Sequence, residues 1–200
     1  SHYSSGYISA AQLDNTSSCS FKKQYYPGHI DETDCIKNNC ELDKKLIITG
    51  PNASGKTTML KSTTINVICS QQIGCGFYES AVINPYTHIH SYLNIPDTSE
   101  RDSLFQAESR RCKEIIDSIV KCPSEEGYRH FGIFDELYSG TNPNEATKSG
   151  FAFLKYLSKF EHVDFILTTH YVKICSKFKK SNYIRNHKMD VVQDDLGKLK

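Results

Sequence analysis

Residues 50–57, Gly-Pro-Asn-Ala-Ser-Gly-Lys-Thr, match the pattern G-x-x-x-x-G-K-[ST], and their setting constrains the fold more than any other part of the chain. The short apolar run 46–49 before them predicts a buried strand, and a helical stretch begins at Lys56. Glycines in such a turn let backbone N–H groups point at phosphate oxygens. The lysine adds positive charge beside them, and the Thr57 hydroxyl is a suitable Mg²⁺ ligand. The motif in this setting predicts a nucleotide-binding loop within an α/β fold.

The rest of the chain alternates between short apolar runs and longer stretches with helical spacing. Strands are expected at 46–49, 81–83, 131–134 and 163–168, and helices at 57–72, 103–121 and 144–159. This alternation predicts a mostly parallel sheet with helices on both faces.

The two ends of the chain differ from this pattern. Residues 1–45 carry turn-forming pairs instead of helical spacing, which predicts a small N-terminal β layer of short strands and loops. Residues 46–200 are expected to form the core of the domain, ending in a β-hairpin over 183–200 with its turn at 194–197. The chain starts with Ser1 and no Met, and we interpret it as a fragment of a longer protein.

Composition narrows the class of protein. Charged residues make up 24% of the chain and the formal net charge is +1, so electrostatics neither demand nor exclude a nucleic-acid partner. No apolar run approaches the length of a membrane span. The eight cysteines contain no C-x-x-C pair, which disfavours a zinc cluster. Free thiols together with a phosphate loop favour an intracellular protein.

Three further polar residues extend the nucleotide loop to a candidate hydrolase. Asp135 follows four apolar residues, so we expect it at the C-terminal end of a buried strand, where it can hold Mg²⁺. Glu136 is turned the other way by strand alternation and can orient and deprotonate an attacking water. His170 ends the next apolar strand and can sense or polarise a γ-phosphate. The alternatives are strand-end solvation for the acidic pair and a hydrogen-bonded core histidine.

Several short motifs together resemble the ATPase domain of MutS-family DNA mismatch-repair proteins over about residues 36–195. These are T-G-P-N at 49–52, G-K-T-T at 55–58, Q-I-G-C at 72–75, E-S-A at 79–81, D-E at 135–136, G-T at 140–141 and T-T-H-Y at 168–171. The L-S-G-G-Q signature of generic ABC transporter ATPases does not occur in the sequence. The resemblance implies an ABC-type P-loop fold that uses ATP and Mg²⁺ and dimerises around two composite nucleotide sites.

The resemblance also implies roles for particular residues. The nucleotide-binding set in the loop is Gly50, Pro51, Asn52, Ala53, Ser54, Gly55, Lys56, Thr57 and Thr58. Thr57 and Asp135 would hold the metal, while Lys56, Glu136 and His170 would be catalytic.

Two residues outside the loop complete the expected site. Ile36 would pack on adenine, where the family usually has an aromatic residue. Ser103, within D-S-L-F-Q-A-E at 102–108, would address the γ-phosphate held by a partner subunit. For Ser103 the alternative is a plain helix N-cap.

The sequence departs from the usual family pattern at two motifs. Ala53-Ser54 and Thr57-Thr58 stand within the loop that usually reads G-P-N-M-G-G-K-S-T, and residues 137–143 read L-Y-S-G-T-N-P where x-G-R-G-T is common. These departures indicate a divergent branch.

The leading interpretation is a Mg²⁺-dependent ATPase that forms an ATP-dependent homo- or heterodimer and couples nucleotide state to DNA binding. The DNA would be contacted by regions mostly outside these 200 residues. The basic clusters at 110–113 and 177–180 are more typical of solvated surface than of phosphate contacts. The alternatives are a nucleotide-gated scaffold with little turnover and an ABC-type ATPase that drives a machine unrelated to repair.

Overall fold

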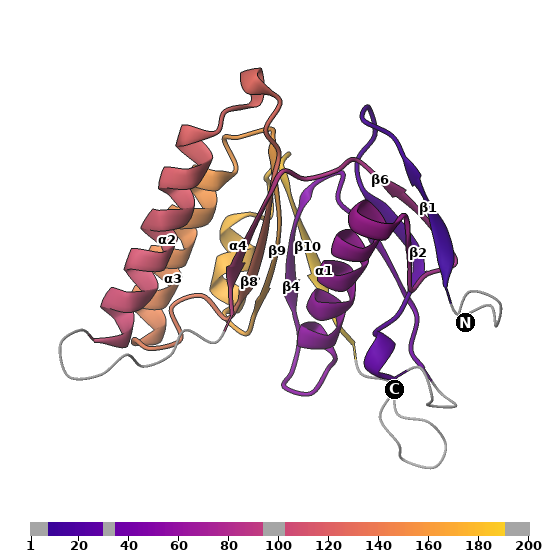
Figure 1. Ribbon diagram of the computed structural model, residues 1–200. Helices are drawn as coiled ribbons and strands as arrows, with labels where there is room; N and C mark the ends of the chain where they lie inside the picture. Colours follow the sequence, from indigo (N-terminus) through magenta and orange to yellow (C-terminus); the bar gives the residue numbers. More distant parts are fainter. Residues whose placement is uncertain (1–7, 30–34, 94–102, 191–200) are drawn as a thin grey trace, which may run out of the picture. The chain divides into compact units, whose positions relative to one another are not determined.

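The computed structural model describes residues 8–29, 35–93 and 103–190, and it divides the chain into two compact units (Figure 1). The first unit consists of Ser1–Asp43, Gly50–Pro85 and Met189–Lys200, and the second of Lys44–Thr49 and Tyr86–Lys188. The expected strand before the phosphate loop belongs to the second unit, whereas the loop and the helix after it belong to the first.

The first unit is a mixed five-stranded sheet with one helix. Its strands are β1 (Ser9–Leu13), β2 (Ser20–Gln24), β3 (Asn38–Glu41), β5 (Cys75–Gly76) and β6 (Ser80–Ile83), in the order β3-β2-β6-β1-β5. The pair β1–β6 is parallel and the other neighbours are antiparallel. A 3-10 turn, η1 (Pro27–His29), follows β2. The short strands expected in the first 45 residues are therefore present, and they share a sheet with strands that follow the phosphate loop.

Helix α1 (Lys56–Ile73) is attached to this sheet through buried polar side chains as well as apolar ones. Asn66 is fully buried; its side-chain oxygen accepts from the Phe77 N–H at 2.7 Å, and its amide donates to the Phe77 carbonyl at 3.2 Å. One turn earlier, Thr63 accepts from the Gln24 amide at 2.6 Å. Gly74 ends the helix in the left-handed conformation, and its N–H donates to the Ser70 carbonyl. These bonds fix the helix that follows the loop to the strands beside it.

The second unit is built on a parallel sheet. Its strands are β4 (Lys45–Thr49), β7 (His88–Tyr92), β8 (His130–Asp135), β9 (Val163–Thr169) and β10 (Ile184–Lys188), in the order β10-β4-β9-β8-β7. All four neighbouring pairs are parallel. The helices are α2 (Leu104–Lys121), α3 (Pro143–Leu157) and α4 (Val172–Lys177), with a 3-10 turn η3 (Ser124–Glu126). The expected mixed α/β fold with a parallel sheet is confirmed.

One apolar core lies between this sheet and its three helices, which occupy one side of it in Figure 1. The strands contribute Ile47, Phe134, Phe165 and Leu167, and the helices contribute Ile115, Ile119, Phe153, Leu154, Leu157 and Ile174. The residues that alternate with these along the same strands are buried as well, for example Ile48, Ile133 and Ile166. Parallel strands are usually buried on both faces, which is why their sequences are continuously apolar. The three helices of this unit all pack on one face, so helices on the second face remain a prediction.

The expected elements of the second unit occur within one or two residues of their predicted positions, apart from the C-terminal hairpin. Strand β7 and helix α4 were not expected from the sequence. The segment predicted as a C-terminal hairpin begins with β10, which pairs in parallel with β4, and its predicted turn lies outside the described residues. No helix among the described residues is long and apolar enough to cross a lipid bilayer.

Candidate functional site

The phosphate-loop motif forms a tight turn in which the lysine is bound to the loop itself. The Lys56 Nζ donates to the carbonyl oxygens of Gly50 at 2.9 Å and Pro51 at 2.8 Å, and the side chain is buried. Ala53 (φ 62°) and Gly55 (φ 82°) are left-handed, which curls the backbone before α1 begins. The ammonium group is thus held across the loop, at the start of a helix whose first N–H groups have no partner within the helix.

Close packing explains the first glycine of the motif. A Cβ on Gly50 would lie 2.7 Å from the Ser54 Oγ and 3.0 Å from the Met189 Cβ, so no other residue fits without movement. The Ser54 Oγ is buried and makes no hydrogen bond within the described part of the chain. Thr57 and Thr58, in the first turn of α1, are exposed. The loop therefore offers a buried hydroxyl, exposed hydroxyls and a lysine, which are groups that bind phosphate.

Ile36, expected to pack on adenine, belongs to the same unit as the loop. Its side chain is 58% exposed, so an apolar surface is available at that position. Nothing else in the geometry assigns it to a base.

Asp135 lies where the sequence predicted, at the carboxyl end of β8 in the second unit. Its carboxylate accepts a hydrogen bond from the Thr168 hydroxyl on the neighbouring strand β9. The pairing register places these two residues side by side. Thr168 was part of a recognised motif but had no predicted role. The signal that could have found it is a hydroxyl at the end of an otherwise apolar run.

Glu136 leaves the strand through a left-handed turn. Its φ is 56°, and its N–H donates to the Thr168 carbonyl at 3.0 Å. The prediction that strand alternation alone redirects this side chain was therefore incomplete, because the backbone turn changes its direction. Its carboxylate is hydrogen-bonded to the His170 Nδ1, and the two side chains are 30% and 51% exposed. A carboxylate paired with an imidazole in this accessible position can accept a proton from water.

Ser103 is the N-cap of α2, in the same unit. Its hydroxyl accepts from the Gln106 N–H at 3.3 Å, while the Gln106 side chain accepts from the Ser103 N–H at 2.8 Å. This reciprocal pair is a capping box. The N-cap interpretation is confirmed, and a role toward a partner subunit is a separate proposal.

The donor set fits Mg²⁺ better than a metal held wholly by protein. No group of three or more His, Cys, Asp or Glu residues within the described ranges could hold a metal ion. Mg²⁺ keeps several waters and binds through one carboxylate or hydroxyl together with substrate phosphates; the second unit offers the Asp135 carboxylate for this, and the first unit the exposed Thr57 hydroxyl.

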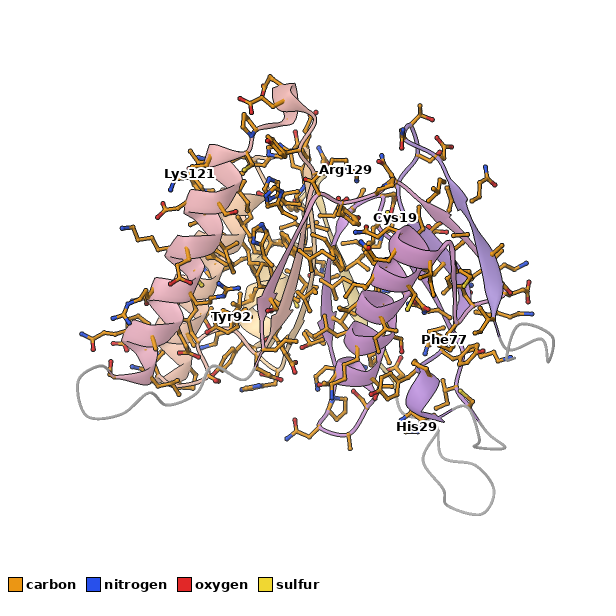
Figure 2. The ribbon with its side chains drawn as sticks, viewed as in Figure 1. Cys19, His29, Phe77, Tyr92, Lys121 and Arg129 are labelled. Carbon is orange, nitrogen blue, oxygen red and sulfur yellow. The ribbon has the colours of Figure 1, made fainter. Side chains whose placement is uncertain are left out.

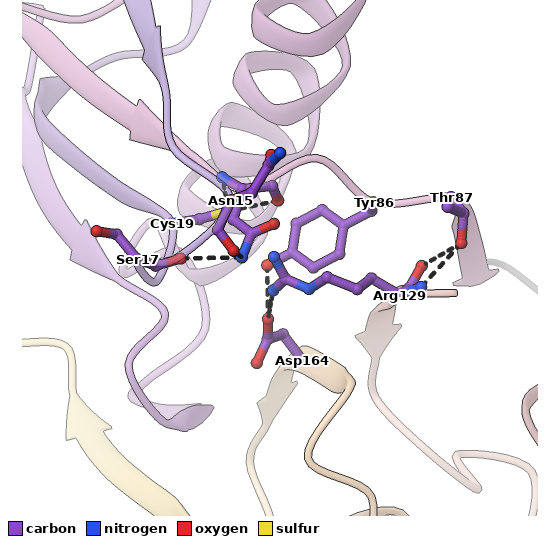
Figure 3. Close-up of polar contacts among 8 residues, drawn as sticks. Asn15, Ser17, Cys19, Tyr86, Thr87, Arg129 and Asp164 are labelled. Carbon is purple, nitrogen blue, oxygen red and sulfur yellow. Dashed lines mark hydrogen bonds and ion pairs between the residues drawn. The ribbon is translucent and has the colours of Figure 1, made fainter. Parts of the chain in front are cut away.

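A second polar cluster lies at the amino end of the same sheet. Asp164 accepts from the Tyr86 hydroxyl at 2.8 Å and from the Arg129 guanidinium at 2.9 Å, and the guanidinium lies 4.9 Å from the Tyr86 ring centre (Figure 3). Burial raises the pKa of Asp164, against the lowering effects of Tyr86 and Arg129. Figure 2 labels Arg129 at this end of the sheet and Tyr92 towards the other.

Three histidine rings stack beside this cluster. His88, His90 and His130 have ring planes within 24° of one another. The His130 Nε2 must donate to the Cys122 carbonyl at 2.9 Å, so its Nδ1 accepts from the His90 Nε2, also at 2.9 Å. Burial, followed by the charges of His130 and His88, lowers the pKa of His90 to about 4. The His90 ring is therefore neutral at pH 7, and the stacked planes of the three rings do not direct nitrogens at one point.

Comparisons with known proteins agree with the motifs. The profile of the family described as MutS domain V matches residues 46–199. The DNA mismatch repair protein MutS of Listeria monocytogenes is 26% identical over 174 residues, covering 82% of this chain and 19% of that protein. The MutS of Staphylococcus saprophyticus is 28% identical over 145 residues, covering 71% and 16%.

A differently named relative matches to the same degree. The endonuclease MutS2 of Streptococcus pyogenes is 28% identical over 166 residues, covering 81% of this chain and 20% of that protein. The chain spans about a fifth of the length of these curated relatives. Because the family profile covers more than half of the chain, the chain belongs to the MutS domain V family.

Proposed function

We propose that this chain is the ATP-binding and ATP-hydrolysing domain of a MutS-like protein, with an ABC-type P-loop fold. The observation that carries the proposal is the group at the carboxyl ends of β8 and β9, where Asp135 is followed by the hydrogen-bonded pair Glu136 and His170. Parallel α/β sheets bind their ligands at this end. The phosphate-loop sequence, which leaves β4 of the same sheet, supports a nucleotide as that ligand.

Phosphate binding is assigned to the loop. Lys56 now donates to two loop carbonyls, and phosphate oxygens are stronger acceptors for an ammonium group. We expect the lysine to exchange those carbonyls for β- and γ-phosphate oxygens when ATP binds. The Ser54 hydroxyl, buried without a partner within the described residues, would donate to a phosphate. Mg²⁺, held by Thr57 and Asp135, would neutralise part of the phosphate charge.

Water activation is assigned to Glu136. Its carboxylate can accept a proton from water while the His170 ring holds it in orientation and stabilises the charge that develops nearby. This arrangement favours hydrolysis over a scaffold with little turnover, because a scaffold needs no accessible carboxylate beside its metal ligand.

The wider role rests on the family. Membership of the MutS domain V family supports the proposal that the whole protein is MutS-like, acts in repair, binds DNA and forms ATP-dependent dimers. In such a dimer we expect Ser103 to face the nucleotide of the partner subunit. A positive helix N-terminus with a hydroxyl suits a γ-phosphate, which ADP lacks. Sedimentation should show dimers with ATP but not with ADP, and Ser103→Arg should block them while leaving ATP binding to the monomer intact. A monomer that ignores ATP would remove the dimer from the proposal.

Two substitutions test binding and hydrolysis separately. Lys56→Ala should weaken ATP binding by about 100-fold or more, measured by calorimetry, because a buried charge-assisted contact is lost. Glu136→Gln should keep ATP affinity and lower hydrolysis by about 100-fold. Lys61→Ala, exposed on the same helix, and Glu161→Gln, exposed on the second unit, are the matched controls. Unchanged ATP affinity in Lys56→Ala, or unchanged turnover in Glu136→Gln, would contradict the corresponding assignment.

A further inference from the structure

A fully buried carboxylate in the second unit has no role in the proposed chemistry. Glu108, on α2, is 1% exposed. Its two oxygens accept hydrogen bonds from the loop that follows Glu136: the Ser139 hydroxyl donates to Oε1 at 3.3 Å and the Gly140 N–H donates to Oε2 at 3.4 Å. A charged group is costly to bury unless it is hydrogen-bonded, so these contacts are what retain Glu108 in the interior.

Two neighbouring residues of α2 hold the same loop. A Cβ on Gly140 would lie 2.4 Å from the Leu104 Cγ, so the loop backbone lies directly against the start of the helix. The ring of Phe105 lies 5.5 Å from that of Tyr138. Residues three and four apart along a helix lie on the same face, so Glu108 reaches the loop beside both Phe105 and Leu104. The first turns of α2 therefore contact three consecutive loop residues, 138–140.

A tyrosine at the end of β7 completes the network. The Tyr92 hydroxyl accepts from the Tyr138 N–H at 3.1 Å and is hydrogen-bonded to Glu108. Burial and then the Glu108 carboxylate raise the pKa of Tyr92, against the effect of the Tyr138 N–H, so the hydroxyl remains a neutral donor to Glu108. Tyr138 has a φ of 58°, a conformation that a bulky residue keeps only when its surroundings hold it.

The loop fixed in this way carries Glu136 at its beginning, and the helix that fixes it begins at the Ser103 cap. We propose that Glu108 is a positioning residue. It links the backbone turn at Glu136 to the N-terminus of α2 at Ser103, so that the turn and the helix N-terminus move together when a partner subunit binds. This inference rests on the proposed function for its consequence: hydrolysis in one chain would depend on the nucleotide that its own Ser103 contacts in the partner.

The first experiment needs no nucleotide. Hydrogen exchange of amides 137–141 is measured in the protein, in Glu108→Gln and in Glu114→Gln, an exposed carboxylate on the same helix. Gln keeps the size of Glu but turns one acceptor oxygen into a donor that faces the Ser139 and Gly140 donors. We expect exchange in this segment to rise about tenfold in Glu108→Gln, the effect of one lost hydrogen bond, and to stay unchanged in the control. Equal exchange in all three proteins would show that Glu108 does not hold the loop, and it would overturn the proposal.

The second experiment measures ATP hydrolysis and affinity. Glu108→Gln should lower kcat by about 10- to 100-fold through displacement of Glu136, with the Kd for ATP unchanged. In the unaltered protein, ATP turnover per chain at saturating ATP should rise with protein concentration as dimers form. The variant should still dimerise, but its turnover per chain should no longer depend on protein concentration. Equal kcat, or a loss of activity that only follows the unfolded fraction, would overturn the positioning role.

A second variant guards against a folding defect at the buried charge. Gly140→Ala moves the loop away from Leu104 without changing any charge, and it should reproduce the loss of kcat at unchanged Kd. Full activity in Gly140→Ala would count against the proposal. A parent protein that neither binds nor hydrolyses ATP would overturn the proposed function, and the exchange comparison would then decide by itself whether α2 holds the turn.

Discussion

The two ends of the parallel sheet in the second unit both carry acidic residues, but they use them differently. At the amino end, Asp164 is bonded to a guanidinium and a phenol, and the side chains of Asp164 and Arg129 are 12% and 22% exposed. At the carboxyl end, Glu136 is bonded to an imidazole, and these two side chains are 30% and 51% exposed. The first carboxylate is largely buried between a guanidinium and a phenol, whereas the second is hydrogen-bonded to an imidazole at a position that solvent reaches.

This difference separates a structural polar cluster from the one that we propose to be reactive. A largely buried carboxylate with two fixed partners is shielded from water, so its contribution is to the fold. A carboxylate that solvent reaches can act on a bound water. We therefore expect substitutions at the amino end to change stability and substitutions at the carboxyl end to change turnover.

The largest effect should come from Asp164→Ala. The substitution leaves the Arg129 guanidinium and the Tyr86 hydroxyl without their shared acceptor, and we expect a loss of about 3 kcal/mol in the free energy of unfolding. Urea denaturation measures it, with the exposed Glu161→Ala as the control. The folded fraction should keep its ATP affinity. A variant as stable as the parent would show that the amino-end cluster does not stabilise the fold, which would contradict the structural role that we assign to this end of the sheet.

The stacked histidines predict a pH dependence. The folded-state pKa of His90 is about 4, below the ordinary value of 6.5, so the unfolded chain binds more protons between these values. Its contribution to stability is complete above pH 6.5 and falls as pH drops toward 4. Between pH 7 and pH 5 this amounts to about 2 kcal/mol.

The variant His90→Gln isolates that contribution, since Gln does not titrate and its amide can still donate to His130. All other groups titrate in both proteins, including Asp164, whose raised pKa acts with the opposite sign. The parent should lose more stability than the variant over this range. Identical pH profiles would show that His90 is protonated in the fold as easily as in the unfolded chain.

A smaller effect is expected from Thr168→Val at the carboxyl end. The substitution keeps the shape of the side chain but removes the hydroxyl that orients Asp135. ATP hydrolysis should fall about tenfold, the usual scale for a residue that orients a metal ligand, which is the role proposed for Asp135. Stability should fall by only about 1 kcal/mol. Steady-state phosphate release gives the first number and urea denaturation the second. A large loss of stability with normal turnover would reverse the assignment of this end.

The smallest effect concerns Ser103→Ala, which removes the N-cap of α2. We expect a loss of about 1 kcal/mol from the free energy of unfolding. Ser118→Ala, in the interior of the same helix, should cost nothing, because alanine is the better helix former there. If Ser103→Ala leaves stability unchanged, the cap contributes little, and any loss of dimerisation in the same variant would have to come from the missing hydroxyl.

Much of this arrangement could be predicted because buried parallel strands have continuous apolar sequences. Strands β8 and β9 follow from such runs, and Asp135 and His170 follow from the positions at which the runs end. Strand β7 reads His-Ile-His-Ser-Tyr, whose polar residues hide a strand that is stabilised by contacts with His130. No local pattern signals such a strand.

The residues proposed for the site could be named from the sequence, but the contacts between them could not. The bond between Glu136 and His170 depends on the register of β8 against β9 and on a left-handed turn at a residue other than glycine, neither of which leaves a mark in the sequence. Glu108, in contrast, is signalled by the sequence, because it interrupts the apolar face of α2 formed by Leu104, Cys112 and Ile115. A charged residue at such a position signals a buried hydrogen-bonding role.

The strand order has a consequence for how the chain is made. Strand β4 lies between β9 and β10, both of which follow it by more than 100 residues. During synthesis, the apolar residues 46–48 leave the ribosome long before either partner exists. Pairing of such distant segments is slow, and unpaired apolar strands aggregate readily. A nascent chain of this protein must therefore shield one short segment, by a chaperone or by transient contacts, until β9 and β10 have been synthesised.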